Sequence, residues 1–197
     1  MKTRDFLKKH RACADGAKWA LSMSDDMADV WDAMLSQEKW EWLIWTLSRP
    51  GVFPESVLRK MVCKFIRKTP LSDGRTVWDM LTDERSRKAV EVAERYADRK
   101  AMNEELYAAC AAARDAADAA YGADAAACAA YAADAVRAAD GAACAAYGAR
   151  AAARAADAAG SAADAAADAA YAHAKAAQIK MIAEVGNPFR KGKKNEN

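Results

Sequence analysis

Residues 107–178 read YAACAAARDAADAAYGADAAACAAYAADAVRAADGAACAAYGARAAARAADAAGSAADAAADAAYAHAKAAQ. Of these 72 residues, 43 are alanine and none is proline. Alanine has the highest helix propensity of the amino acids and proline the lowest, so the stretch predicts α-helix throughout. Alanine side chains also let helices approach closely, near the ~8 Å end of the usual range of interaxial distances. We therefore expect the rest of the chain to lead into these helices or to cover them.

Three glycines divide this stretch, because Gly122, Gly141 and Gly160 lie 19 residues apart. Glycine costs about 1 kcal/mol relative to alanine inside a helix and is favoured just past a helix end. Ser161 and Asp164 follow Gly160 in a pattern close to a capping box. We therefore expect helices of roughly 18 residues, each ~27 Å long, that break near the three glycines and pack as a bundle. The alternative is one rod of ~108 Å.

The preceding region, residues 1–102, contains all six tryptophans and shows helical periodicity without a strand pattern. Start and stop signals predict helices over residues 3–14, 17–22, 24–35, 36–48, 55–68 and 82–99, with Gly16 as an interruption and a helical turn over 76–81. The sequence thus predicts an all-α fold in three parts. These are an N-terminal tryptophan-containing helical region (residues 1–102), an alanine-rich helical bundle (residues 103–186) and a basic, disordered tail (residues 187–197).

Charge and hydropathy exclude several classes of protein. The net charge is only +2, and the alanine-rich stretch carries eight Asp against five Arg and Lys, which argues against a nucleic-acid-binding protein. The N-terminus lacks the apolar core of a signal peptide, and no run of ~18 uncharged apolar residues predicts a membrane span. The five cysteines have no C-x-x-C spacing, which is typical of buried free thiols in a reducing cytosol. We expect a cytoplasmic protein.

Motifs for catalysis are missing from the sequence. It contains no P-loop, no G-x-S-x-G and no dinucleotide-binding fingerprint. The two histidines, His10 and His173, are 163 residues apart, and neither has another residue at metal-ligand spacing. Acidic pairs such as Asp115 and Asp118 lie beside Arg114 and are typical of solubilising charges. The sequence predicts neither an enzyme nor a bound metal or cofactor.

Two sets of residues are candidates for binding a partner, and the first is the tryptophan segment. Residues 40–47 have one apolar face that carries Trp40, Leu43, Ile44 and Leu47, and a second face that carries Trp42 and Trp45. Either this helix is central to the core, or the second face is an exposed patch that contacts a partner. The basic side of residues 55–68 is likewise either a solvated face or a site for an anionic partner.

The second set is a row of tyrosines and cations in the alanine-rich stretch. A short repeat, Cys or Asp followed by Ala-Ala-Tyr, places Tyr121, Tyr131, Tyr147 and Tyr171. In a structural interpretation these rings fill gaps that alanine leaves. In a functional interpretation they stack on bases while nearby cations bind phosphates, and these cations are Arg137, Arg150, Arg154, His173 and Lys175. We call these residues the Tyr/Arg row.

The segment TDERSRKAVEVAERYA (residues 82–97), followed by an acidic helix start and alanine-rich helices, resembles a bacterial family of immunity proteins. Residues 40–45 and the ending Asn187-Pro-Phe-Arg190 are also similar to hypothetical proteins of planctomycetes and phages. The resemblance implies a helical protein that neutralises its target by binding.

Three functional hypotheses follow. The first is a non-catalytic binding protein in immunity or counter-immunity, which neutralises a toxin or defence factor stoichiometrically through Trp42, Trp45 and the Tyr/Arg row. The second is a phage-type sponge that sequesters a small anionic signalling nucleotide between tyrosine rings and arginines. The third is a structural alanine-rich coiled coil that forms homo-oligomers.

Overall fold

The computed structural model describes residues 1–71, 73–119 and 164–190. In these residues the fold is all-α, as the sequence predicts, and their secondary structure contains no strand. The expected helix breaks near Gly122, Gly141 and Gly160, and hence the choice between a bundle and a rod, lie outside the described residues.

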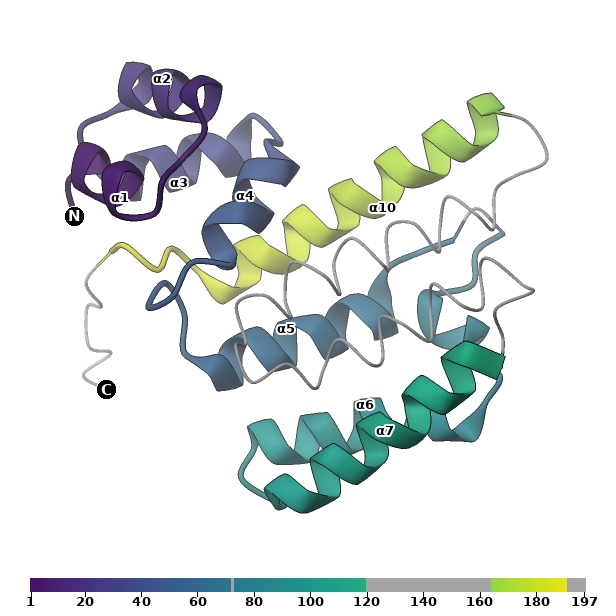
Figure 1. Cartoon of the computed structure of the whole chain (residues 1–197). Coiled ribbons are helices and arrows are strands. Elements are labelled where there is room, and N and C mark those ends of the chain that lie inside the picture. The colour runs from purple at the N-terminus through teal and green to yellow at the C-terminus, as the bar shows by residue number, and fades with distance from the viewer. Residues whose placement is uncertain (72, 120–163, 191–197) are drawn as a thin grey trace, which may run out of the picture.

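Four short helices form the N-terminal end of the molecule (Figure 1). They are α1 (Thr3–Lys9), α2 (Ala14–Met23), α3 (Met27–Ser36) and α4 (Trp40–Leu47). Each of α1, α2 and α3 packs against the other two, and α4 packs against α3. These helices therefore enclose a small unit of their own, with α4 on the side nearest the rest of the protein.

The boundaries of these helices differ from the prediction at two places. Gly16 lies inside α2 and does not interrupt a helix, because α2 begins at a cap in which Sγ of Cys13 accepts a hydrogen bond of 3.4 Å from the Gly16 N–H. The chain turns instead at Arg11 and, between α3 and α4, at Glu38, which both have positive φ angles (52° and 51°). Non-glycine residues seldom adopt this conformation, so neither turn has a clear sequence signature.

The remaining helices lie beside this N-terminal unit (Figure 1). They are α5 (Glu55–Lys68), the 3₁₀ helix η1 (Val77–Met80), α6 (Glu84–Ala97), α7 (Asn103–Ala119) and α10 (Asp164–Val185). α7 packs against α6, α6 against α5, and α10 against both α5 and α4. α10 ends where Gly186 takes a positive φ of 89°, which agrees with the predicted stop at this glycine.

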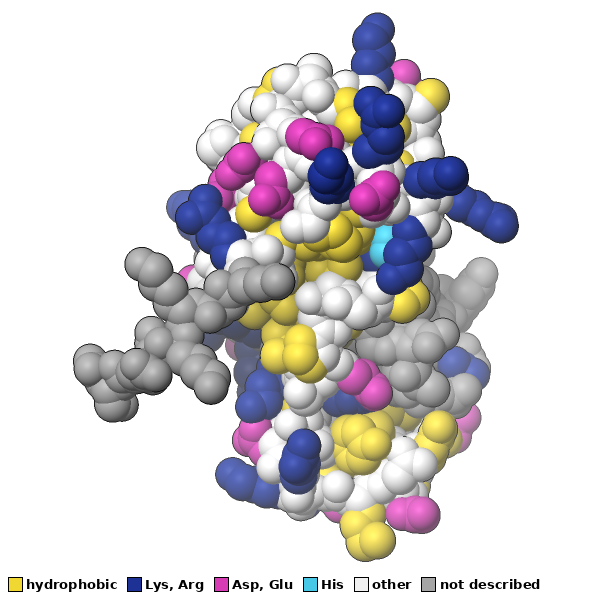
Figure 2. Space-filling view, turned by 90° about the vertical axis from the view of Figure 1, so that its left-hand side faces the viewer, with side chains coloured by type: hydrophobic (Ala, Val, Ile, Leu, Met, Phe, Trp, Pro, Cys, Tyr) yellow, Lys and Arg dark blue, Asp and Glu magenta, His cyan; other side chains and the backbone are white. Residues whose placement is uncertain are grey.

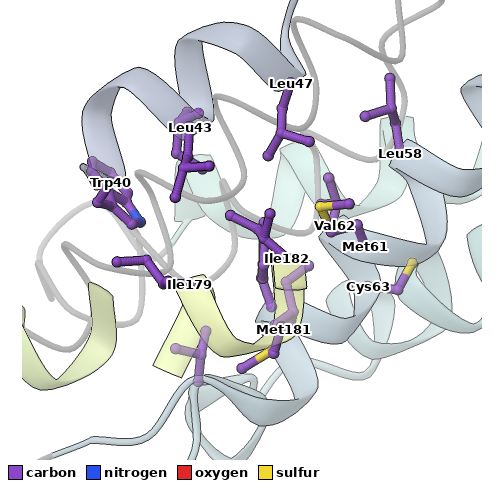
Figure 3. Packing of buried hydrophobic residues seen from close by; sticks show 14 of the residues in the cluster. Trp40, Leu43, Leu47, Leu58, Met61, Val62, Cys63, Ile179, Met181 and Ile182 are labelled. Atoms are coloured by element: carbon purple, nitrogen blue, oxygen red, sulfur yellow. The ribbon is translucent and has the colours of Figure 1, made fainter. Parts of the chain in front are cut away.

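A continuous hydrophobic core joins the N-terminal unit to the other helices. Figure 3 shows Leu43 and Leu47 of α4, Val62 of α5 and Ile182 of α10 directed toward one another, and all four side chains are fully buried. The same cluster extends from Phe6 in α1 to the buried alanines of α7. Burial of large apolar side chains contributes about 1.5–3 kcal/mol each, so this shared core is what holds the helices together.

Residues 187–190, which we assigned to a disordered tail, pack against α1 and α3. The side chain of Asn187 donates hydrogen bonds to the Ala28 carbonyl (2.8 Å) and to Oδ1 of Asp32 (2.9 Å). The ring of Phe189 meets Phe6 edge to face, with 5.3 Å between ring centroids. The prediction of a disordered tail relied on the many basic residues of 187–197. The contacts are made by two uncharged residues of this segment, Asn187 and Phe189.

Candidate functional site: the indole pocket

An apolar pocket opens within the N-terminal unit, between α1, α2, α3 and α4. Its volume is about 240 Å³. We call it the indole pocket, because three tryptophans, Trp19, Trp42 and Trp45, form part of its wall. An apolar cavity of ~150 Å³ is enough to bind a molecule of benzene, so this pocket has room for one aromatic or branched aliphatic group.

The three indoles are held in place by contacts on their outer sides. Trp19 and Trp42 pack with their ring centroids 4.7 Å apart and tilted by 47°. The Nζ atom of Lys39 lies 5.6 Å from the Trp42 ring, and the guanidinium of Arg49 lies 4.9 Å from the Trp45 ring. Such cation–π contacts are worth about 0.5–1 kcal/mol at exposed sites. These contacts restrain the three indoles within the structure.

Gly16 of α2 lies next to the Trp42 indole. A Cβ atom at position 16 would lie 3.2 Å from Sγ of Cys13 and 3.7 Å from Nε1 of Trp42. An added side chain would therefore crowd the cap of α2, whereas its distance to the indole is an ordinary van der Waals contact. The glycine that we interpreted as a helix breaker thus lies inside α2, at the wall of the pocket.

The other apolar residues of the wall are four aliphatic residues and two methionines. They are Leu7, Ala12, Ala20, Met27, Val30 and Met34. Phe6 closes the pocket and is itself only 1% exposed. Methionine side chains are flexible and polarisable, so a wall that contains two of them adapts to ligands of different shape.

Few polar groups line the pocket. The hydroxyl of Thr46 donates to Sδ of Met34 at 3.8 Å. Glu41 forms an ion pair with Lys175, with 2.6 Å between Oε1 and Nζ. Cys13, which we expected to be buried, is exposed. Its Sγ atom accepts the hydrogen bond from the Gly16 N–H that caps α2.

The structure brings together only part of the predicted binding residues. Trp42 and Trp45 are half-buried and pack against the core, so each of them both supports the fold and lines the pocket. His173 is exposed on α10. Tyr171 and Lys175 of the Tyr/Arg row also lie on α10. The remaining members of the row lie outside the described residues: Tyr121, Tyr131, Tyr147, Arg137, Arg150 and Arg154.

Tyr171 is already engaged within the protein. Nζ of Lys175 lies 4.3 Å from the Tyr171 ring and 4.7 Å from the Trp40 ring. The same ammonium group pairs with Glu41. At this end of the Tyr/Arg row, the cation and the ring therefore join α10 to α4.

Two arginines on the basic side of α5 are engaged within the protein, whereas Lys60 and Lys68 on the same helix are exposed. Arg59 is 3% exposed, pairs with Glu55 and lies 5.1 Å from the Tyr96 ring. Arg67 makes two hydrogen bonds to the Glu94 carboxylate (2.6 and 2.8 Å), and these hydrogen bonds raise the pKa of Arg67. These arginines stabilise the packing of α5 against α6. The sequence could not show this, because the acids of α6 come from a separate helix.

In the described residues no group of three or more His, Cys, Asp or Glu side chains could hold a metal ion. No helix among them has the length and apolar character needed to cross a membrane. A scan against protein-family models, a search of curated proteins and a search of solved structures each found no match.

Sequence reasoning found two of the three tryptophans of the pocket as candidates and missed the third. Helical spacing places Trp42 and Trp45 on one face of α4, and it also directs Trp19 inward from α2. The contact between Trp19 and Trp42 depends on the path of the chain between α2 and α4. No local signal in the sequence specifies that path.

Proposed function

We propose that this chain is a non-catalytic binding protein that captures a protein partner through the indole pocket. The observation that carries the proposal is an apolar pocket of about 240 Å³ that is lined by three tryptophans and opens to the surface. A partner would insert one large apolar side chain there and make weaker contacts around the rim.

The composition of the pocket supports a protein partner. Interfaces between proteins derive most of their binding energy from a few anchors, often tryptophan, in well-packed apolar pockets. Such anchors cost about 2–4 kcal/mol when they are truncated. The indole pocket is smaller than the ~300–1,000 Å³ of typical small-molecule sites, but it matches the volume of a single side chain.

The biological setting that we propose comes from the resemblance of residues 82–97 to immunity proteins. In this setting the protein acts in immunity or counter-immunity in the cytoplasm. There it neutralises a toxin or defence factor by stoichiometric binding, and no chemical step is needed.

The test uses a matched pair of substitutions in the full chain. Ala12 lines the pocket and is half-buried, whereas Ala14 is exposed and does not line it. Ala12→Phe places a ring in the pocket, and Ala14→Phe adds the same ring to the outer surface. Tagged wild-type protein and both variants would be used to capture partners from lysates of the source cells.

We expect wild type and Ala14→Phe to retain the same protein in a one-to-one ratio and Ala12→Phe to lose it. Calorimetry with the purified partner should then show at least a tenfold weaker Kd for Ala12→Phe. The proposal is wrong if wild type captures no protein in a fixed ratio, or if Ala12→Phe binds the partner as tightly as Ala14→Phe does.

A further inference from the structure

A second hollow, separate from the mouth of the indole pocket, lies where the two ends of the described chain meet. It is a cleft of about 700 Å³ bordered by the N-terminus, the end of α1, the turn after α4 and residues 188–190. We call it the basic cleft. This volume lies within the range of ~300–1,000 Å³ that small-molecule sites usually have.

Positive charge gathers around this cleft. Its lining includes the α-ammonium group of Met1 and the side chains of Lys9, His10 and Arg190. Figure 2 shows the face of the molecule on this side, where both basic and acidic side chains border a hydrophobic area. Partial burial, and after it the charges of Lys9 and Arg49, lowers the pKa of His10.

The one acidic residue in the lining is already engaged. Asp26 caps α3 by accepting a hydrogen bond of 2.9 Å from the Ala28 N–H, and it lies 3.5 Å from the Met1 ammonium nitrogen. Asp32 does not line the cleft, but it pairs with Arg190. The Met1 ammonium and Arg190 therefore each have an acidic partner, and Lys9 adds a further positive charge to the lining.

The floor of the cleft is apolar and partly aromatic. The ring centroids of His10 and Phe6 lie 4.6 Å apart, and the ring of Phe189 meets Phe6 edge to face. Val52 and Pro188 complete this surface. A ligand that fits must therefore join an anionic group to a flat apolar body.

We propose that the basic cleft binds a small phosphorylated aromatic compound, with its phosphate among the cations of the rim and its ring on the apolar floor. Phosphate suits a site with several cations because it offers charge and several hydrogen-bond acceptors at once. The ring supplies the apolar area that inorganic phosphate lacks. This inference does not rest on the function proposed for the indole pocket.

The two histidines of the chain provide the readout. His10 lies in the cleft, and His173 is exposed on α10, so His173 is an internal control. Phenyl phosphate would be titrated into the full-length protein while the imidazole resonances of both histidines are followed by NMR. A dianion in the cleft offsets the charges of Lys9 and Arg49, so it should raise the pKa of His10 and leave the resonances of His173 in place.

Lys9 and Lys8 supply the matched variants. Both are exposed and lie in the last turn of α1, but only Lys9 lines the cleft. We expect Lys9→Glu to weaken phenyl phosphate binding at least tenfold and Lys8→Glu to weaken it less than threefold. The affinity of Lys9→Gln for phenyl phosphate should lie between those of wild type and Lys9→Glu.

Two further ligands serve as controls. Phenol and inorganic phosphate should each bind at least tenfold more weakly than phenyl phosphate.

The proposal is overturned if phenyl phosphate at about 10 mM leaves the His10 resonance in place. This concentration is about ten times a Kd of 1 mM, so even a weak site would be mostly occupied. It is also overturned if both histidines respond alike, or if Lys8→Glu and Lys9→Glu weaken binding equally. Equal binding of phenyl phosphate and inorganic phosphate would show that the apolar floor takes no part.

Discussion

The indole N–H of Trp40 donates a hydrogen bond of 2.9 Å to Oε1 of Gln178, which is 138 residues away in the sequence. Both side chains are buried. Nε2 of Gln178 in turn donates to Oγ1 of Thr69 at 3.3 Å. This connection joins α4, α10 and the end of α5, so the last polar residue of the alanine-rich stretch is tied directly to the tryptophan segment.

Replacing Gln178 should reveal how much this connection stabilises the fold. Gln178→Leu removes an acceptor from Trp40 and a donor to Thr69, and a buried polar group that loses its partner costs about 1–3 kcal/mol. We expect the free energy of unfolding, measured with denaturant, to fall by about this amount.

A control and a double variant separate this hydrogen bond from packing. Lys180 is exposed on the same helix, so Lys180→Leu should change the free energy of unfolding by less than about 0.5 kcal/mol. In a Trp40→Phe background, Gln178→Leu should cost less than it does in wild type, because the indole N–H is already gone. An equal cost in both backgrounds would show that the hydrogen bond contributes nothing.

The sequence predicted helices well where proline and threonine mark their ends. α5 begins after Pro54 and ends before Thr69, as predicted, because Pro54 fits a helix start and the Thr69-Pro70 pair disfavours further helix. The predicted end of α1 and the predicted start of α4 were wrong, because Arg11 and Glu38 take left-handed conformations that non-glycine residues seldom adopt.

The candidate site was less predictable than the fold. Spacing within one helix placed Trp42 and Trp45 together, but the pocket also needs Phe6 of α1 and Trp19 of α2. Trp19 meets Trp42 with ring centroids 4.7 Å apart, and Phe6 meets Trp45 at 6.0 Å. Sequence spacing describes one helix at a time, so a pocket assembled from four helices lies beyond it.

The indole pocket should bind a small apolar probe even without its partner. At about five times its Kd, benzene should raise the free energy of unfolding by about 1 kcal/mol, because it binds only the folded state. Differential scanning calorimetry measures this as a higher Tm. Ala12→Phe should remove the response and Ala14→Phe should keep it; a response that both variants share would place the probe elsewhere.

Phe189 should contribute to stability although five of the eight residues that follow it in the sequence are charged. Its ring is half-buried and lies between Phe6 and Trp31, with centroid distances of 5.3 and 6.1 Å. Removing a fully buried phenylalanine side chain costs about 3–5 kcal/mol, so we expect Phe189→Ala to cost about 2 kcal/mol. Phe189→Leu, which keeps most of the apolar contact, should cost less than half as much. If Phe189→Ala unfolds at the same denaturant concentration as wild type, the segment 187–190 does not hold α1 and α3.

The cap of α3 should make stability depend on acid pH. The hydrogen bond from the Ala28 N–H, together with the charge and hydrogen bond of the N-terminal ammonium, holds the pKa of Asp26 below its usual value of 3.8. A carboxylate whose pKa is lower in the folded state stabilises the fold above its unfolded pKa and loses this contribution as pH falls through the folded pKa.

Asn is also a good helix cap but does not ionise in this range, so Asp26→Asn should keep the cap and lose the pH dependence. The stability advantage of wild type over Asp26→Asn should therefore be largest near pH 5 and should shrink as the pH falls below 3.8. Urea unfolding at a series of acid pH values measures this difference, and an advantage that stays constant or grows toward low pH would contradict the assignment.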